Sequence, residues 1–291
     1  MDGELVRYLY HELFRSCKAP PRGCVFNDEV ILFIYFLAVA SDRSVLWAHD
    51  RRHWPLWARR LPRPSYSQLM RRLKSDTIQE RIRILNATLR DRLPRASDKY
   101  LDGKPLVVGV FTRDPDVAWG KLSNDTWARG YKLHLVFDAA GVVEAAQVTP
   151  LNGSESITAR ALVEFMNLSG ALVRADSSYD SNALYQAIAQ RGGRLIAPRK
   201  KPGRGLGHHP QHPHRLQAIQ LLEGSSEART IHRRLRIRVE QGLAHMTNLP
   251  FGLAPLPNWV RRLERVRRWV LAKISLYHLH LNLRLCNTNV A

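Results

Sequence analysis

The sequence predicts an α/β fold in which helices flank a mixed sheet and an all-helical region precedes it. Apolar residues recur at helical spacing over about the first hundred residues, and alternating or β-branched segments replace them further on. These later segments follow the order strand, strand, strand, helix, strand, helix, strand, helix, which is typical of a mixed sheet with flanking helices. We therefore expect a helical region over residues 1–96 and an α/β domain, with a C-terminal helix, over residues 97–291.

Capping residues and apolar spacing define the helices of the N-terminal region. Asn27 can cap a buried helix that is apolar on all faces over residues 30–40, and a shorter helical piece is expected around residues 44–50. Asp76 can cap a longer helix. That helix presents apolar residues at helical spacing, namely Ile78, Ile82, Leu85 and Leu89.

Ser65 can cap another helix over residues 66–74, whose side chains suit DNA. Gln68, Arg71 and Arg72 are side chains that reach base edges and phosphates. One interpretation is a helix-turn-helix that reads sequence, and the other is a small basic bundle that touches only backbone phosphates. Either way, we expect residues 1–96 to be the DNA-binding region.

The α/β domain is expected to begin with a strand over residues 106–111 and a hairpin. The turn at 138–141 joins strands over 131–137 and 142–148. The remaining elements are a helix over 156–168, a buried strand over 171–175, a helix over 181–191, a strand over 194–198, a loop over 199–215, a helix over 229–246 and a final helix capped by Asn258.

The charge of the chain points to a polyanionic partner. The formal net charge is +20, from 45 Lys and Arg against 25 Asp and Glu, and the isoelectric point is about 10.6. Residues 51–100 and 191–291 carry net charges of +10 and +15, whereas residues 101–190 carry −3. An acidic middle between basic segments fits a nuclease, because carboxylates can hold metal ions while arginines neutralise the phosphates of the substrate. The alternative is a basic surface with ordinary solvated acids.

The cysteines and the apolar runs exclude other classes of protein. Three cysteines, at positions 17, 24 and 286, are too few and too widely spaced for a disulfide framework or a zinc site. The longest apolar run, residues 30–40, is too short to span a bilayer, and the acidic start is unlike a signal peptide. We expect a soluble, reduced, intracellular protein that does not bind a membrane.

Three acids occupy places where a two-metal site would need them. Asp102 is expected at the entry of the first strand, and Asp176 at the C-terminal end of a buried strand, where ligands gather in α/β sheets. Glu240 lies in the helix over 229–246, on a stripe with Arg233 and Arg236. Ile231, Leu235, Val239 and Leu243 are expected to form the buried face of the same helix.

Several motifs, in this order and spacing, resemble a known family. They are Asp102-Gly103-Lys104-Pro105-Leu106, Asp114-Pro115-Asp116 with Trp119-Gly120, Gly130 to His134, Val148 to Asn152, Ala175-Asp176 with Tyr179-Asp180, Ile196 to Arg199, Arg236 to Glu240, and Leu256 to Lys273. Over roughly residues 100–275 the sequence resembles the DDE-type insertion-sequence transposases, in the group named after insertion sequence four.

The resemblance implies a fold, a site and a chemistry. The fold would be ribonuclease-H-like, and Asp102, Asp176 and Glu240 would be the catalytic triad that binds two Mg²⁺ or Mn²⁺ ions. The group's signature around the glutamate is Tyr-x₂-Arg-x₃-Glu-x₆-Lys. Arg236 and Glu240 match it, whereas Arg233 and Thr247 occupy the tyrosine and lysine positions.

Other residues offer rival or additional roles. Asp114 and Asp116 are rivals of Asp102 for the first acid, but they fall in a turn-like stretch. Lys132 and His134 share one face of a strand, where they either approach the scissile phosphate or are ordinary polar-face residues. The histidines at 208, 209, 212 and 214 lie among prolines and glycines, which favours a loop over a metal site because metal ligands need a fixed geometry.

The function expected from these observations is DNA transposition. The helical region would bind the terminal inverted repeats of an element, and the α/β domain would cut the ends and join them to target DNA. Arg233, Arg236 and Lys132 would contact DNA beside the acids. Since two ends are cut together, we expect a homodimer on DNA, in the cytoplasm and at the nucleoid of a bacterium. The alternatives are a ribonuclease-H-like nuclease without strand transfer and a catalytically inactive DNA-binding protein.

Overall fold

The structure is a computed structural model that describes residues 3–16, 26–122, 126–253 and 255–288. The chain forms two compact units, one of Met1–Leu93 with His245–Ala291 and one of Pro94–Ala244. The boundary near residue 94 lies close to the expected one, but the C-terminal segment groups with the N-terminal helices. The assignment of DNA binding to residues 1–96 and of catalysis to residues 97–291 stays a prediction.

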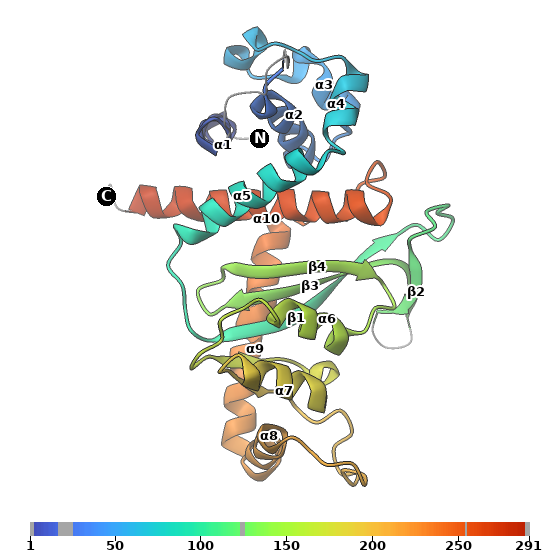
Figure 1. The fold of residues 1–291 in the computed structure, drawn as a ribbon, viewed down its shortest axis with the longest axis vertical. Helices are drawn as coiled ribbons and strands as arrows, with labels where there is room; N and C mark the ends of the chain where they lie inside the picture. Colours follow the sequence, from blue (N-terminus) through green and yellow to red (C-terminus); the bar gives the residue numbers. More distant parts are fainter. Residues whose placement is uncertain (1–2, 17–25, 123–125, 254, 289–291) are drawn as a thin grey trace. The chain divides into compact units, whose positions relative to one another are not determined.

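The first unit is helical (Figure 1). Its elements are α1 (Gly3–Ser16), α2 (Asp28–Ala40), α3 (Val45–His49), η1 (Arg51–His53), η2 (Leu56–Arg60), α4 (Tyr66–Arg72), α5 (Asp76–Asp91) and α10 (Leu263–Thr288). Every residue of α2 is buried, as its apolar sequence predicts. The buried face of α5 consists of the four apolar residues expected from their spacing. Asn282 of α10 donates a hydrogen bond to the Leu89 carbonyl of α5 at 2.8 Å, which joins these two helices.

Two helix starts differ from the prediction. The N-cap of α5 is Ser75, whose hydroxyl accepts from the Ile78 amide, and Asp76 is instead the first helical residue. The final helix begins at Leu263 and is not capped by Asn258. The Asn258 side chain accepts from the Arg261 guanidinium at 3.1 Å, and Arg262 adopts a φ of 75° immediately before the helix. That left-handed residue breaks the helical path that the sequence pattern predicts.

The second unit contains a mixed sheet. Its strands are β1 (Lys99–Val108), β2 (Ala118–Lys121), β3 (Trp127–Asp138), β4 (Val143–Pro150), β5 (Leu172–Arg174) and β6 (Arg194–Ile196). β3 pairs antiparallel with β1, β2 and β4, whereas β1, β5 and β6 run parallel to one another. This ribonuclease-H-like order confirms the predicted fold class.

The first strand begins earlier than predicted. β1 starts at Lys99, so that Asp102 lies inside the strand rather than at its entry. Gly103 and Pro105 weaken the strand pattern in the sequence, which accounts for the later predicted start. They are tolerated because β1 pairs along its whole length with β3, from Lys99 opposite Asp138 to Val108 opposite Arg129.

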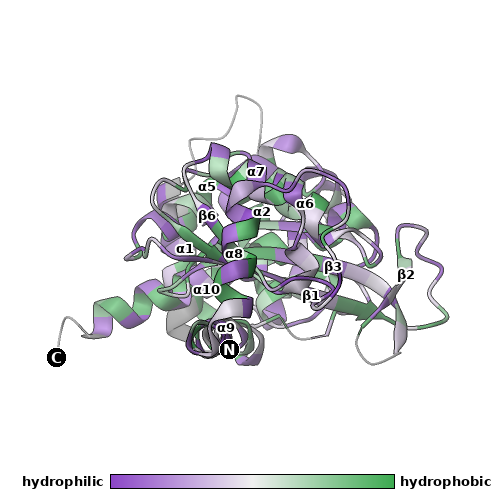
Figure 2. Cartoon of the chain, turned by 90° about the horizontal axis from the view of Figure 1, so that it is seen from below, coloured by the Kyte–Doolittle hydropathy of each residue, from purple (hydrophilic) through white to green (hydrophobic). Residues whose placement is uncertain are grey.

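Four helices accompany the sheet: α6 (Glu155–Val163), α7 (Asn182–Gln190), α8 (Pro213–Gly224) and α9 (Ser226–Asn248). A buried core joins α6 and α7 to the sheet through residues such as Leu101, Val136 and Ile188. Figure 1 shows α9 running behind the sheet, on the side away from α6. Figure 2 shows hydrophilic and hydrophobic stretches alternating along the helices. Among the described residues, no helix has the length and hydropathy needed to cross a membrane.

Two expectations for these helices are wrong. Helix α8 occupies residues that were expected to be partly loop; its first residue is Pro213, which fits a first helical turn, and His212 accepts a hydrogen bond as its cap. In α9 the expected buried face is rotated, because Ile231 is 47% exposed whereas His232 is buried. The side chain of Val239, like Cys17 and Cys24, lies outside the described residues, and Cys286 is exposed.

The predicted DNA-binding residue Arg72 takes part in a buried ion pair of the first unit. Its guanidinium pairs with Asp28, which is nearly buried, and donates to the Phe26 carbonyl at 3.1 Å. Arg81 lies at 3.6 Å from the other oxygen of Asp28. Removing the partner of a buried carboxylate is costly, because that carboxylate loses hydrogen bonds without regaining water.

We therefore expect Arg72→Ala to lower the free energy of unfolding by about 1–3 kcal/mol, as measured by urea unfolding. The control is Arg71→Ala, since Arg71 is the exposed neighbour, and it should change stability by less than about 0.5 kcal/mol. Equal stabilities of the two variants would contradict the structural role of Arg72 and leave its side chain available to DNA.

Candidate active site

Asp102 lies in β1, and Asp176 lies two residues beyond the end of the neighbouring parallel strand β5. The pairing of β1 with β5 sets Tyr100 opposite Arg174. Asp102 is two residues after Tyr100, and Asp176 is two residues after Arg174. Because side chains alternate along a strand, Asp102 lies on the face of Tyr100, whereas Asp176 follows the end of β5 and caps the short 3-10 helix η3 (Ser177–Tyr179). The structure thus brings the first two predicted acids together at one edge of the parallel part of the sheet.

Each aspartate uses one oxygen to fix its own side chain. Oδ1 of Asp102 accepts from the Gly103 amide at 2.8 Å. Oδ1 of Asp176 accepts from the Ser178 amide at 2.8 Å and from the Ser178 hydroxyl. In the part of the chain that the structure describes, no hydrogen bond is formed by Oδ2 of either aspartate. Two oriented carboxylates with available oxygens are donors of the kind that a hard divalent cation prefers.

The pKa of Asp102 records how crowded this place is with negative charge. Burial raises it to about 6, and the carboxylates of Asp176 and Glu155 act in the same direction. The Gly103 hydrogen bond and the Arg236 guanidinium oppose the rise. A carboxylate that is costly to ionise beside its neighbours is stabilised when a cation binds next to it.

Helix α9 brings arginines to the site. His232 is buried, and its pKa falls to about 4 because of burial and of the positive charges of Arg174 in β5 and Arg236. Arg236, one turn after His232, also acts on Asp102. The predicted stripe of Arg233, Arg236 and Glu240 lines a cavity of about 420 Å³, together with Arg199, Arg229 and His232. Neither aspartate is among the described residues that line this cavity, whose arginines can donate hydrogen bonds to phosphate oxygens.

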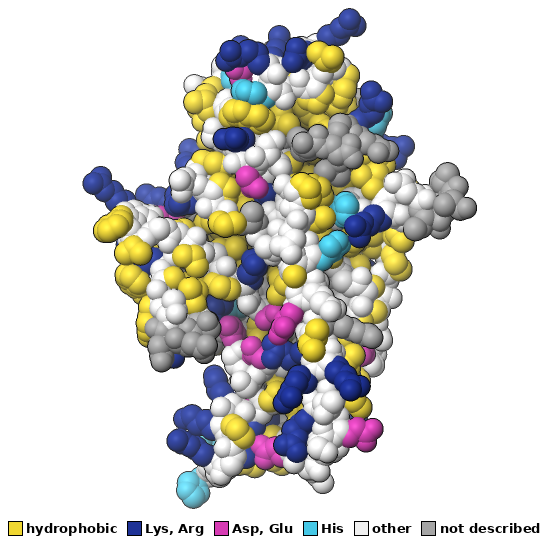
Figure 3. Space-filling view, turned by 180° about the vertical axis from the view of Figure 1, so that it is seen from behind, with side chains coloured by type: hydrophobic (Ala, Val, Ile, Leu, Met, Phe, Trp, Pro, Cys, Tyr) yellow, Lys and Arg dark blue, Asp and Glu magenta, His cyan; other side chains and the backbone are white. Residues whose placement is uncertain are grey.

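Glu240 does not join the two aspartates in a three-member cluster. Its side chain is exposed on the cavity, one turn after Arg236. Among the described residues, no three His, Cys, Asp or Glu side chains converge closely enough to hold a metal ion. Figure 3 shows acidic side chains gathered at one place on the surface, with Lys and Arg side chains beside them.

The other predicted residues of the second unit have structural partners. The Lys132 ammonium lies 2.9 Å from Glu155, which competes with a role in DNA binding. His134 is buried and hydrogen bonds to the Thr149 hydroxyl at 3.0 Å. Asp114, the rival first acid, is buried and accepts from the Tyr131 hydroxyl.

In the N-terminal helix α4, the structure separates the three predicted DNA contacts. The amide oxygen of Gln68 accepts from the Ser65 amide at 3.0 Å, so that the two residues form a capping box. Arg72 is held by Asp28, as described above. Arg71 has an exposed side chain and is the one best placed to contact a phosphate.

Sequence reasoning missed three residues next to the aspartates. Glu155 begins α6, Ser178 bonds to Asp176, and Tyr179 is buried with its hydroxyl close to Gly103. Tyr179 was noted only as part of a motif. Glu155 stands out in the sequence as an acid directly after the cap residue Ser154, but this is also the ordinary place for a stabilising helix-terminal carboxylate.

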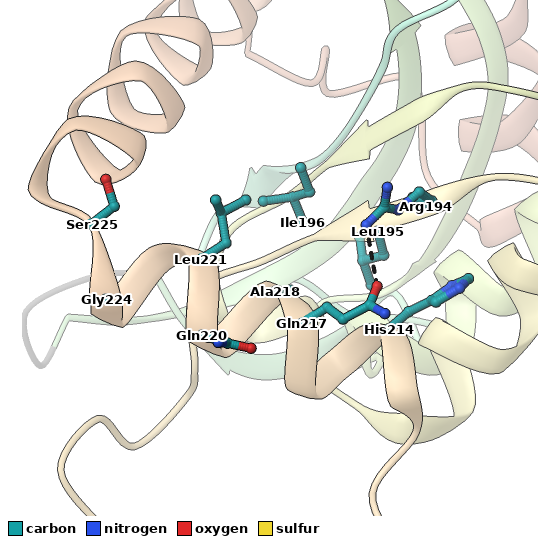
Figure 4. Close-up of a pocket in the computed structure, with 10 residues that line it drawn as sticks. All are labelled: Arg194, Leu195, Ile196, His214, Gln217, Ala218, Gln220, Leu221, Gly224 and Ser225. Carbon is teal, nitrogen blue, oxygen red and sulfur yellow. Dashed lines mark hydrogen bonds between the residues drawn. The ribbon is translucent and has the colours of Figure 1, made fainter.

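A second cavity lies at the free edge of the sheet (Figure 4). It has a volume of about 540 Å³ and lies between β6 and α8, with Arg194 hydrogen bonded to Gln217 at 3.2 Å. No acidic side chain is among the described residues that line it, so that it offers no carboxylate to a metal ion. It is therefore not the candidate active site.

The comparison with family models identifies the family to which the chain belongs. Residues 99–279, more than half of the chain, match the model of the transposase DDE domain. The chain belongs to this family. The resemblance to DDE-type transposases is thereby confirmed, while no curated protein matches the chain.

Two solved transposase structures are similar to the chain at low identity. One is the cryo-EM structure of the piggyBac transposase synaptic complex with hairpin DNA, with 11% identity, a TM-score of 0.38, and coverage of 96% of this chain and 78% of that one. The other is the Mos1 transposase paired-end complex with left transposon end, with 10% identity, a TM-score of 0.25, and coverage of 89% and 82%. Both likenesses are weak.

Transposases of the DDE family generally use divalent metal ions. The donors of this chain fit such an ion, since two neighbouring aspartates each leave Oδ2 without a hydrogen bond from any described residue. The pKa of Asp102, which burial raises and to which the charges of Asp176 and Glu155 add, points the same way.

The buried histidine next to this site makes stability depend on pH. Burial, with the charge of Lys132, lowers the pKa of His134 to about 4, whereas an unfolded histidine titrates near 6.5. The unfolded state therefore takes up the proton first, and the stability supplied by neutral His134 is complete above about pH 6.5 and lost as the pH falls toward 4. The shift corresponds to about 3 kcal/mol.

We expect urea unfolding at pH 7 and pH 4.5 to show a larger loss of stability for the wild type than for His134→Gln. The matched control is His208→Gln, which removes an exposed histidine and should follow the wild type. If His134→Gln loses as much stability as the wild type, His134 is not held in its neutral form.

Proposed function

We propose that the chain is a DNA transposase that cuts the ends of a mobile element by metal-dependent phosphodiester hydrolysis and joins the freed 3′-hydroxyl to target DNA. The observation that supports it best is the pair of aspartates in β1 and directly after β5, together with Arg236 of α9, which acts on Asp102 and lines a cavity with other arginines of that helix. Membership of the transposase DDE domain family agrees with this arrangement.

The residues have distinct roles in this proposal. Asp102 and Asp176 hold Mg²⁺, or Mn²⁺, through their available oxygens. Glu240 of α9 would be the third acid of the set that the family resemblance implies, although in this structure it lines the cavity with Arg236 and stands apart from the aspartates. Two divalent ions, when bound, activate the attacking oxygen and stabilise the leaving one.

Arginines orient the substrate. Arg233 and Arg236 extend from one face of α9 into the cavity, with Arg229 one turn earlier. Their guanidinium groups would bind phosphate oxygens of the strand to be cut and hold the scissile bond against the aspartates. Arg71 of α4 would contact DNA outside the catalytic region. Because two element ends are processed together, we propose that the chain acts as a homodimer on double-stranded DNA that carries terminal inverted repeats.

The role of the aspartates is tested by Asp176→Asn. We expect no cleavage of supercoiled plasmid carrying the element's ends in the presence of Mg²⁺, because the amide is a poor ligand for the ion. DNA binding, measured by gel retardation, should be unchanged or tighter, since a negative charge is lost beside the phosphates. Asp91→Asn, at the exposed end of α5, serves as the control and should cleave normally. Cleavage by Asp176→Asn at the wild-type rate would refute the site.

The products formed by the wild type separate the proposal from its two competitors. Joined products between element ends and target DNA support the transposase. Cleavage without joining indicates a nuclease, and retarded but intact DNA indicates a binding protein that has lost its chemistry.

The role of α9 is tested by adjacent arginines that differ in their position. Arg233 lines the cavity, whereas Arg234 is exposed and does not line it. We expect Arg233→Ala to weaken DNA binding and to reduce the slope of log K against log salt by about 0.9, the value for one lost phosphate contact. Arg234→Ala should leave that slope unchanged. Equal slopes for both variants would exclude this face of α9 as the phosphate-binding surface.

A further inference from the structure

The long strands β1 and β3 contain three lysines, and these differ in their partners. The Lys99 ammonium lies 2.6 Å from the Glu144 carboxylate, and the Lys132 ammonium lies 2.9 Å from the Glu155 carboxylate. Both of these lysines are largely buried with their acids. Lys104 of β1 is different, because no residue within the described ranges forms a hydrogen bond or an ion pair with its ammonium. Its charge is therefore not used by the fold.

Lys104 lies on the same face of the sheet as Asp102. β1 pairs with β3 without interruption from Lys99 to Val108, so that its side chains alternate regularly between the two faces. Two residues separate Lys104 from Asp102, which places them on one face, about 7 Å apart along the strand. The negative charge of Asp102 acts on Lys104, as this placement requires. One face of β1 thus carries both the first aspartate and a positive charge.

The side chain of Lys104 is partly buried against an apolar neighbour. Lys104 lies directly opposite Leu133 of β3, which is fully buried. Cross-strand neighbours of this kind are in contact, and a lysine stem can pack along apolar surface while its ammonium turns toward water. Burial lowers the pKa of Lys104, although the charge of Asp102 opposes the change. A partly buried charge without an ion pair costs free energy, and an anion bound beside it would offset that cost.

The side of β1 that faces β5 is open at Lys104. β5 pairs with β1 only at Lys99 and Tyr100, and no other strand of the described residues pairs with that side of β1. Lys104 therefore lies beyond the end of β5, at the carboxyl edge of the parallel strands. Ligands of α/β sheets bind at this edge. A DNA strand held at Asp102 and Asp176 would thus pass close to Lys104.

We propose that Lys104 is a substrate-binding residue whose ammonium contacts a phosphate oxygen of the DNA strand to be cut, beside Asp102 and Asp176. The inference rests on the proposed function, because it adds a substrate contact at the same site. A compact ammonium on a long stem is suited to binding a phosphate as a point charge. Lys104 takes this role in place of Lys132, whose ammonium is held by Glu155.

The test measures binding of a labelled duplex that carries one element end, at several salt concentrations. The background is Asp176→Asn, in which the DNA stays intact. We expect Lys104→Met, which keeps an unbranched stem and removes the charge, to weaken binding roughly 10-fold and to reduce the slope of log K against log salt by about 0.9. Lys104→Arg keeps the charge and should keep the slope. A slope that Lys104→Met leaves unchanged would overturn the proposal.

The matched control is Arg191→Gln. Arg191 is exposed and lies at the end of α7, ahead of β6 and therefore at the opposite edge of the parallel strands from Asp176. Its loss should leave the salt slope unchanged. If Arg191→Gln lowers the slope as much as Lys104→Met does, the effect is one of net charge and the proposal is wrong.

Stability and metal binding separate a substrate contact from a structural role. We expect the urea midpoint of Lys104→Met to equal or exceed that of the wild type, because a partly buried charge without an ion pair is removed. Mn²⁺ binding to the full chain without DNA, measured from the electron paramagnetic resonance signal of the free ion, should be unchanged or tighter, since a positive charge near Asp102 is lost. A lower midpoint, or weaker Mn²⁺ binding, would make Lys104 a support of the fold or of Asp102 and overturn the proposal.

Lys104→Gln repeats these measurements with a polar side chain and should give the same three results, so that a packing defect specific to methionine is recognised. A wild type that cleaves DNA, with a salt slope that both Lys104→Met and Lys104→Gln leave unchanged, refutes this inference only. A wild type that neither binds Mn²⁺ nor cleaves DNA refutes the proposed function.

Discussion

The candidate site depends on the burial of Asp102 close to a second carboxylate, Asp176. Parallel pairing of β1 with β5 sets the register, and Asp102 and Asp176 each lie two residues beyond the last paired residues of these strands. The hydrogen bonds from Gly103 and Ser178 then fix the two side chains. Burial and the neighbouring negative charges raise the pKa of Asp102 to about 6. The backbone thus holds two carboxylates close together although their negative charges repel each other. A divalent cation bound between them would reduce that repulsion.

The basic charge of the chain is not uniformly available to DNA. The +10 charge of residues 51–100 includes Arg72 and Arg81, which neutralise the nearly buried Asp28. In the basic C-terminal segment, Arg215 pairs with the buried Asp180, and Arg199 pairs with Glu223. The arginines of α9 that line the cavity are a different case, because they point toward a space that a phosphate could enter. Net charge therefore indicates the kind of partner, while ion pairing decides which arginines can meet it.

The sequence was sufficient for those parts of the structure that depend on local patterns. Neighbouring residues determine local burial and turn formation. The sequence therefore predicted the buried helix α2, the apolar stripe of α5 and the hairpin of β3 and β4. The rotation of α9 was not, since Ile231 is the more apolar residue while His232 is the buried one, next to Arg174 of another element. For the same reason Asp102 and Asp176 were found from strand ends and family motifs, whereas Glu155 was missed. Its partner in the structure is Lys132, which lies 23 residues earlier in the chain.

The charges around the aspartates also show why the ion pair of Glu155 matters. The charges of Asp176 and Glu155 act on Asp102, and the positive groups that act on Asp102 and Glu155 include Arg236 and Lys132. If Lys132 were free to follow a phosphate, Glu155 would add its full charge to a place that already repels a polyanion. Because Lys132 pairs with Glu155, the remaining negative charge lies on the two aspartates, and the Arg236 guanidinium acts on Asp102. This excess of negative charge favours the binding of a divalent cation before DNA binds. Each phosphate that enters the site adds negative charge and favours cation binding further.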